Sequence, residues 1–288
     1  MRDDVRLTRD NVAILVDSTA DMPEFIAKDQ NVSMIPLLVR FGAETYRDWI
    51  DITPSAFYPK LRAAKELPTT SLPSVGEFVA VYRDLRSRYD YVYSFHLSSK
   101  ISGTFGAATV AAEQVDNVTV VDTGICSSGI ALLVQRLLMR IEAGTTHQGT
   151  MDYIAWFQEN LIMLFLLDTL EYIVKGGRVG NAAGLVGTLL NIKPILTFKD
   201  GLVTPFKKAR GEKKAMQVIS ETVAERTHPD APLHVAVAHA EVPDKAQEMI
   251  DAVRQTGRPV ESSFITELGS VIGTYGGPRS RVLFVLQE

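Results

Sequence analysis

The order of apolar runs and helical patterns along the chain restricts its fold more than any other feature. A continuous apolar run from Asn11 to Val16 is typical of a strand that is buried on both faces. Further short apolar runs follow it, and helical patterns separate them. We predict strands at 11–16, 32–39, 91–97 and 118–121, and helices at 54–65, 75–89, 102–114, 129–143 and 150–160. Strands that alternate with helices predict an α/β fold with a parallel sheet covered by helices.

The pattern changes after about residue 160. Asp200-Gly201 lies between two apolar runs, which is the strongest short-range signal for a β-hairpin. We predict strands at 163–167, 195–198, 202–205, 234–239, 260–265 and 281–286, and helices at 212–226 and 243–255. A chain of 288 residues is long enough for two domains. We therefore predict an N-terminal α/β domain over residues 1–160 and a C-terminal α+β domain over residues 161–288.

Two helix ends carry recognisable capping residues. Asp21 is followed three residues later by Glu24, and this spacing predicts an N-cap and capping box for a helix that runs through Lys28. Gly144 follows the last apolar residue of the predicted helix at 129–143, so we expect it to be the C-cap.

Composition excludes several classes of protein. The chain has 30 Lys and Arg against 34 Asp and Glu, so no overall positive field would attract nucleic acid. Cys126 is the single cysteine and can form neither an internal disulfide nor a cysteine metal cluster. The longest strongly apolar run, Leu161–Leu167, is far shorter than a bilayer helix, and the first ten residues lack a signal-peptide apolar region. We expect a cytoplasmic protein.

Three polar clusters follow predicted strands or precede predicted helices: 17–19, 69–71 and 98–104. Open α/β sheets bind ligands at such positions. In the last cluster, Ser102 and Gly103 would expose backbone N–H groups at the positive end of a helix, where a carboxylate or phosphate oxygen fits. The alternative interpretation is that these serines and threonines are ordinary N-caps and turn residues.

Small residues recur from Gly176 to Leu190. They allow either close backbone packing or space for an apolar ligand. Lys175 and Arg178 lie beside this stretch and could form a solvated face, a phosphate clamp or a partner contact. The glycine spacing matches neither a Walker A loop nor GxGxxG, which disfavours nucleotide binding.

Motifs of common catalytic and metal sites are absent from the sequence. There is no HExxH, EF-hand loop, GxSxG or CxxC, and the five histidines lack metal-ligand spacing. His96 lies near Ser98, but a chain of this length offers such pairs by chance. His239 ends a predicted strand and either lines a site or is structural. We therefore predict no catalytic residue, no metal and no cofactor, and we expect Cys126 to be a buried core residue.

Eight segments, taken in order, resemble motifs of the DegV family of bacterial lipid-binding proteins. They run from Ile14 to Pro278 and read VDSTADMP, IPLLVRFG, PTTSLPS, LSSKISGTF, LDTLEYIVKGGRVG, IKPIL, ARGEKKA and ELGSVIGTYGGP. The resemblance implies a two-domain fold that encloses one long-chain fatty acid in a tunnel between the domains. The best understood members, called FakB, are the fatty-acid-binding subunits of a fatty acid kinase system that serves phospholipid synthesis.

The resemblance also implies roles for individual residues. Hydroxyl groups would hold the carboxyl head, with Ser98 and Ser99 as alternatives to Ser102 in the loop that follows one strand. The predicted ligand-binding residues are Thr70, Ser71, Ser98, Ser99, Ser102, Gly103, Thr274 and Tyr275. Arg178 and Arg210 match basic positions that serve the kinase partner, which would phosphorylate the presented carboxyl group. A transient contact with a membrane or an acyltransferase is also compatible with this role.

Three positions depart from the family pattern. Tyr275 stands where the family usually has histidine, and it can donate a hydrogen bond but cannot supply imidazolium charge. Trp49 and Arg279 stand where the family usually has glycine. These differences concern the head-group geometry and kinase competence more than the fold.

The energetics of lipid binding agree with uncharged head-group residues. Burying a 16-carbon tail is worth about 10 kcal/mol before ordering costs, whereas a neutral hydrogen bond contributes about 0.5–1.5 kcal/mol. The tail would supply most of the affinity and the hydroxyls the orientation. Two other hypotheses remain: a serine-dependent acyl hydrolase or phosphotransferase using Ser98 or Ser102, and a lipid-binding regulator without a kinase.

Overall fold

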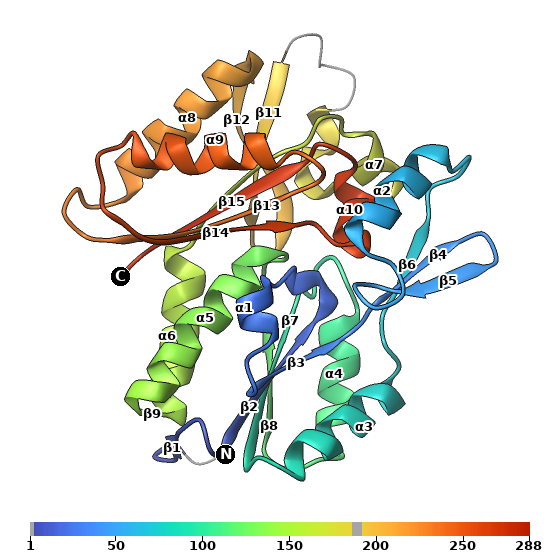
Figure 1. Ribbon diagram of the computed structural model, residues 1–288, viewed down its shortest axis with the longest axis vertical. Coiled ribbons are helices and arrows are strands. Elements are labelled where there is room, and N and C mark those ends of the chain that lie inside the picture. The colour runs from blue at the N-terminus through green and yellow to red at the C-terminus, as the bar shows by residue number, and fades with distance from the viewer. Residues whose placement is uncertain (1–2, 186–191) are drawn as a thin grey trace.

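The N-terminal half is built on a four-stranded parallel sheet. The computed structural model describes residues 3–185 and 192–288 (Figure 1). The sheet has the order β3-β2-β7-β8, with β2 (Val12–Asp17), β3 (Val32–Ile35), β7 (Tyr91–His96) and β8 (Val118–Asp122). Helices α3 (Val75–Arg86) and α4 (Thr104–Ala112) cover one face, and α5 (Ser128–Ala143) packs on the other. This arrangement confirms the predicted α/β fold.

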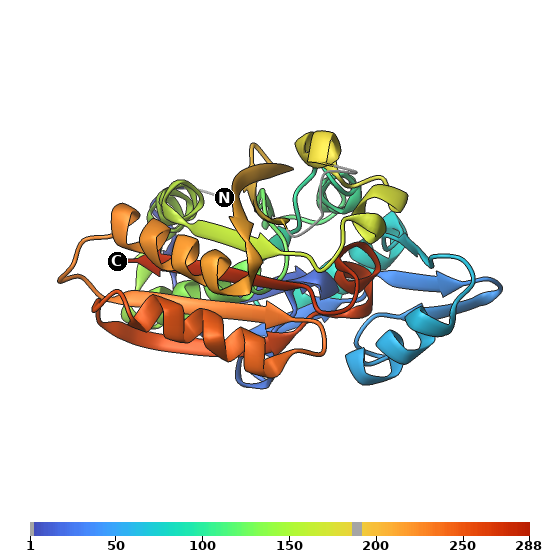
Figure 2. The ribbon, with the colours of Figure 1, turned by 90° about the horizontal axis from the view of Figure 1, so that it is seen from above.

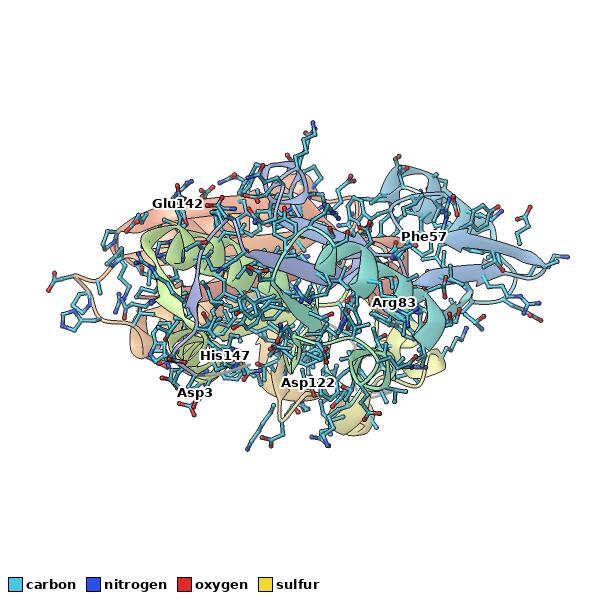
Figure 3. The ribbon with its side chains drawn as sticks, turned by 90° about the horizontal axis from the view of Figure 1, so that it is seen from below. Asp3, Phe57, Arg83, Asp122, Glu142 and His147 are labelled. Carbon is cyan, nitrogen blue, oxygen red and sulfur yellow. The ribbon has the colours of Figure 1, made fainter. Side chains whose placement is uncertain are left out.

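Apolar residues on both faces of β2 explain why this strand is central. Ala13 and Leu15 pack with α3 and α4, whereas Val12 and Ile14 pack with α5. Helix α6 (His147–Asn160) follows α5, and Gly144 between them has φ +88°, as expected for a glycine C-cap. At the start of α6 lies His147, which Figure 3 labels, and its Nδ1 atom lies 2.5 Å from the Tyr93 hydroxyl. A short pair, β1 (Arg6–Leu7) and β9 (Thr145–Thr146), lies beside this helix.

The C-terminal half contains a six-stranded mixed sheet with the order β12-β11-β10-β15-β13-β14. Its strands pair antiparallel, except for β13 and β14, which are parallel. Helices α8 (Gly211–Arg226) and α9 (Pro243–Arg254) cover one face, and the other face turns toward the N-terminal half (Figure 1). The strands are β10 (Ile162–Leu166), β11 (Ile192–Lys199), β12 (Leu202–Arg210), β13 (Leu233–His239), β14 (Val260–Glu267) and β15 (Arg281–Gln287).

A third, small sheet projects to one side of the molecule (Figure 2). It has the order β5-β4-β6 and consists of β4 (Leu38–Phe41), β5 (Glu44–Arg47) and β6 (Thr69–Ser71). Together with α2 (Pro54–Ala63) we call it the arm, residues 38–71. An ion pair between Arg62 of α2 and Glu241 after β13 ties the arm to the C-terminal half.

The strand predicted at 32–39 is confirmed over residues 32–35, but its continuation to residue 39 is wrong, because the chain leaves the parallel sheet there. Strand β3 ends at Ile35 and β4 begins at Leu38 in the arm. Pro36 lies between them, and proline cannot donate a hydrogen bond to a strand ladder. The residues that follow therefore start a new sheet.

The predicted Asp21–Glu24 capping box is also wrong. Helix α1 (Glu24–Ala27) begins after Pro23 and has no side-chain cap. Asp21 instead ends a 3₁₀ turn, η1 (Ser18–Ala20), with φ +45°, and its carboxylate points to more distant donors described below.

The hairpin at Asp200-Gly201 is confirmed. These two residues have φ values of +53° and +76° and join β11 to β12. Helices α7 (Glu171–Lys175) and α10 (Ser270–Gly276) were not predicted. The small-residue stretch forms a 3₁₀ turn, η2 (Gly180–Leu185), and its continuation at 186–191 lies outside the described residues. In the described part of the chain, no helix is long and apolar enough to span a bilayer.

Candidate functional site

A pocket lies between the carboxyl edge of the parallel sheet and the inner face of the mixed sheet. It contains about 810 Å³ of space not occupied by protein atoms, which includes space open to solvent. Its position agrees with the expected location of ligand sites in open α/β sheets. Most of its wall is apolar: Leu37, Leu97, Ile101, Cys126, Met163, Phe165, Leu167, Ile173, Phe198, Val203, Leu268, Val271, Ile272 and Val282. Such a wall suits a hydrocarbon ligand.

Seven polar residues line the pocket: Thr70, Ser102, Ser127, Arg178, Tyr275, Ser280 and Arg281. One group of them lies around Tyr275. The Tyr275 hydroxyl lies 2.6 Å from Thr70 Oγ1, and both residues line the pocket with Ser102. The guanidinium of Arg178, also a lining residue, lies 4.9 Å from the centre of the Tyr275 ring. Arg178 donates to the carbonyl oxygens of Gly176 at 2.8 Å and Ile101 at 3.3 Å. We call Thr70, Ser102, Arg178 and Tyr275 the polar end of the pocket.

Ser102 reaches the polar end from the loop between β7 and α4. Its hydroxyl lies 2.8 Å from Thr104 Oγ1 and accepts a weak bond from the Thr104 N–H at 3.3 Å. The loop places Ser102 at the amino end of α4, where Gly103 is the N-cap and has no side chain to cap the helix. A carboxylate beside Ser102 would therefore meet a hydroxyl and the positive end of a helix.

Helix α10 brings four residues to the pocket wall: Val271, Ile272, Tyr275 and Gly276. Gly176 at the end of α7 lies directly against the Tyr275 ring, where a Cβ atom would clash. The sequence did not predict this helix, because glycines at positions 269, 273, 276 and 277 obscure its helical pattern.

Two buried carboxylates from the N-terminal half hold the start of α10. Asp48 Oδ1 accepts from the Ser270 N–H at 2.7 Å and the Ser270 hydroxyl at 2.6 Å. Asp21 accepts from the Gly269 N–H at 2.8 Å and from Ser127 Oγ at 2.6 Å. Burial raises the pKa of Asp48 to about 6, although hydrogen bonds from Ser270 and Ser18 oppose the shift. Burial also raises the pKa of Asp21 well above its ordinary value.

A second polar group resembles a catalytic triad but is closed to ligands. His96 Nδ1 lies 3.0 Å from Asp17 Oδ2, and His96 Nε2 lies 2.7 Å from Ser94 Oγ. All three side chains are completely buried, and none of them lines the pocket. The Tyr82 hydroxyl also donates to Ser94. This group joins β2, β7 and α3 and has a structural role.

The remaining predicted site residues lie near the pocket but are not among its lining residues. Ser98 is buried and donates to the Gly201 carbonyl at 2.8 Å, which ties the β7–α4 loop to the β11–β12 hairpin. The Ser99 N–H donates to Asp122, which is labelled in Figure 3. Thr274 is buried and donates to the Ser270 carbonyl at 2.8 Å within α10. Ser71 and Gly103 are exposed beside the lining residues Thr70 and Ser102.

Arg210 lies in a separate surface groove. The groove is also lined by Lys193 and Asp168, whose side chains form an ion pair at 3.0 Å. Arg210 is exposed at the end of β12, just before α8. Arg178 and Arg210 therefore differ, because only Arg178 reaches the pocket.

The site offers polar groups for orientation and no metal-binding cluster. Among the described residues, no group of three or more His, Cys, Asp or Glu side chains could hold a metal ion. Cys126 lines the pocket, and burial raises the pKa of its thiol, which keeps it protonated.

Comparisons with known proteins agree on one family. A family model described as an uncharacterised protein of the DegV family matches residues 11–288. A DegV domain-containing protein of Halalkalibacterium halodurans is 37% identical over 272 residues, which cover 93% of this chain and 96% of that protein.

Solved structures give the same result. A DegV family protein from Thermus thermophilus, described for its fatty acid binding, superposes with a TM-score of 0.92 at 34% identity and covers 96% of this chain and 100% of its own. The Fatty Acid Kinase (Fak) B3 protein of Streptococcus pneumoniae, loaded with linoleic acid, has a TM-score of 0.83 at 19% identity and covers 96% of this chain and 100% of its own. At that identity, the second likeness shows a shared fold only.

Proposed function

Since this chain belongs to the DegV family, we propose that it binds one long-chain fatty acid in the pocket between its two halves. The observation that carries the proposal is an apolar pocket with three hydroxyl groups and the Arg178 guanidinium at one end. Thr70, Ser102 and Tyr275 are the proposed partners of the carboxyl group. The solved Thermus thermophilus relative, described for fatty acid binding, supports the ligand class.

The lining of the pocket suits this ligand. Each methylene buried against an apolar wall contributes about 0.8 kcal/mol to the free energy of binding. The tail is therefore the main source of affinity. The hydroxyls of Thr70 and Tyr275 are already 2.6 Å apart, so they are arranged to contact one carboxyl group together.

We further propose that the protein presents the carboxyl group to a separate fatty acid kinase in the cytoplasm. Arg178 is exposed and lines the polar end, so it can contact both the ligand and an approaching partner. Arg210 is exposed and outside the pocket, and we assign it to the partner alone. In this role the chain binds its ligand without turning it over. We propose that its two domains comprise residues 1–160 and 161–288.

Native mass spectrometry of the purified chain tests ligand binding. We expect a complex with one co-purified fatty acid, or uptake of one palmitate by delipidated protein. The absence of any bound lipid together with no uptake of palmitate or oleate would reject the proposal. The double variant Thr70→Ala, Ser102→Ala should retain palmitate less well, whereas Ser99→Ala should behave like the wild type because Ser99 does not line the pocket.

Two arginine variants separate ligand binding from kinase recognition. We expect Arg210→Glu to reduce kinase-dependent acyl-phosphate formation with unchanged palmitate affinity. Arg178→Glu should reduce both, since it places a negative charge beside the carboxylate. If neither variant alters acyl-phosphate formation, the two arginines do not recognise the kinase. If the chain forms no acyl phosphate with any kinase of its cell, the function reduces to lipid binding without a kinase.

A further inference from the structure

We propose that Asp48 is a positioning residue for the fatty acid head group, because it fixes the start of α10 and thereby holds the Tyr275 hydroxyl against Thr70. Asp21 supports the same turn. This inference rests on the proposed function, since it concerns the polar end of the same pocket. It adds a residue that lies outside the pocket lining and was not predicted from the sequence.

The carboxylates meet the first turn of α10 at three donors. Asp48 accepts from the backbone N–H and the hydroxyl of Ser270, and Asp21 accepts from the N–H of Gly269. Both acids are buried, with 0% exposure for Asp48 and 1% for Asp21. Loss of either acceptor therefore leaves a buried donor unsatisfied. The start of α10 is fixed to the N-terminal half by these bonds.

Close packing against neighbouring side chains prevents α10 from shifting. The Tyr58 hydroxyl donates to the Leu268 carbonyl at 3.0 Å, just before α10. A Cβ atom on Gly273 would lie 2.7 Å from the ring of Phe57, which Figure 3 labels on the arm. At Gly269 a Cβ atom would lie 3.0 Å from Asp48 Oδ1. The glycines thus allow α10 to pack directly against α2 of the arm. Helix α10 also contacts α7 (Figure 1).

The arm contacts both ends of α10. Asp48 directly follows β5, and its N–H donates to the Leu37 carbonyl at 2.9 Å. Thr70 lies on β6, which pairs with β4 in the same small sheet. Tyr275 lies five residues after Ser270, which corresponds to about 7.5 Å along a helix. The arm therefore supplies Asp48, which holds the start of α10, and Thr70, which contacts Tyr275 near the end of α10.

A hydrogen bond of 2.6 Å makes this arrangement sensitive to small shifts. A displacement of α10 by about 1 Å would separate the Thr70 and Tyr275 oxygens beyond hydrogen-bond distance. The two hydroxyls would then no longer meet one carboxyl group together. Asp48 therefore controls head-group recognition without touching the ligand.

Trp49 adds a further contact to the carboxylates that hold the start of α10. Its indole N–H lies 3.4 Å from Asp21 Oδ1, and its backbone has φ +64°, which is unusual for a residue with a side chain. Such strained residues persist where the surrounding structure determines them. The indole nitrogen of Trp49 thus lies against Asp21 and next to the Cα atom of Gly269, where a Cβ atom would clash with it.

The decisive experiment compares palmitate affinities of Asp48 variants in a double-mutant cycle with Tyr275→Phe. Asp48→Ala should weaken palmitate binding by about two- to thirteen-fold, the effect of one neutral hydrogen bond. Asp48→Asn should bind like the wild type, because its amide oxygen still accepts from Ser270. Asp48→Ala should have no further effect in the Tyr275→Phe background, since both changes remove the same interaction.

Asp29→Ala is the matched control. Asp29 accepts from the Asn31 N–H and from Arg9, as Asp48 accepts from a backbone N–H and a side chain, but it has no contact with α10. The control should lower stability without lowering palmitate affinity. Wild-type affinity in Asp48→Ala, equal weakening in Asp48→Asn, or independent effects of Asp48→Ala and Tyr275→Phe would each overturn the proposal.

A ligand-free measurement separates this proposal from the proposed function. Hydrogen exchange of residues 270–276 should be faster in Asp48→Ala than in the wild type and unchanged in Asp29→Ala. Unchanged exchange in Asp48→Ala refutes the positioning role even if the wild type binds no palmitate. If Asp48→Ala does not fold, Ser270→Ala replaces it in both experiments, because it removes one donor to Asp48. Ser270→Ala with wild-type exchange and affinity would refute the role as well.

Discussion

Replacing Thr70 with valine tests how the binding energy divides between head and tail. Valine keeps the shape of threonine but removes the hydroxyl that lies 2.6 Å from the Tyr275 hydroxyl. One lost neutral hydrogen bond corresponds to about 0.5–1.5 kcal/mol, or roughly a two- to thirteen-fold weaker Kd. Shortening the ligand from palmitate to laurate removes four methylenes from an apolar wall. This change costs about 3 kcal/mol, or roughly 200-fold.

Competition with a fluorescent fatty acid measures both effects on the same delipidated protein. We expect Thr70→Val to weaken palmitate and laurate by the same small factor, because the head group is common to both. Ser99→Ala provides the control, since this hydroxyl is exposed outside the pocket lining. A loss above about 100-fold in Thr70→Val, combined with equal affinities for palmitate and laurate, would refute the reasoning that the tail dominates binding.

Three further predictions concern stability and packing. Arg279 has φ +62°, so Arg279→Gly should raise the free energy of unfolding by about 0.5–1 kcal/mol in urea titrations, and a decrease would contradict this. Asp48 has a folded pKa of about 6 against 3.8 ordinarily, so the folded state holds its proton more tightly. The free energy of unfolding should therefore fall by up to about 3 kcal/mol as pH rises from about 4 to 6, and Asp48→Asn should flatten this slope. Gly176→Ala should displace the Tyr275 ring, lower stability by about 1–3 kcal/mol and weaken palmitate binding; wild-type melting and affinity would contradict the packing.

The sequence predicted those parts of the fold that local patterns determine. Apolar runs identified the strands of both large sheets, and Asp200-Gly201 identified the β11–β12 hairpin. Pro36 was the local signal for the break after β3, but the apolar residues on both sides concealed it. Helix α10 was not predicted, because its glycines lower its helix propensity. Packing against the arm stabilises this helix instead.

The candidate site was predictable only in part, for a related reason. Motif resemblance indicated Thr70, Ser102 and Tyr275, and all three line the pocket. The role of Asp48 depends on Ser270, which is 222 positions away in the chain. Asp21 had a good local explanation as a helix cap, yet its bond to Gly269 spans 248 positions. No pattern within one segment reveals such pairs, because tertiary packing creates them.

The long separation between Thr70 and Tyr275 has a consequence for synthesis on the ribosome. Their hydroxyls meet across 205 positions of the chain. At about 5–20 residues per second, Tyr275 is made roughly 10–40 seconds after Thr70. During that interval the nascent N-terminal half can form its parallel sheet. The arm cannot yet pack against α10, because α10 has not been synthesised. In the proposed function, the growing polypeptide therefore cannot bind a fatty acid at the Thr70–Tyr275 pair until its last helix has been made.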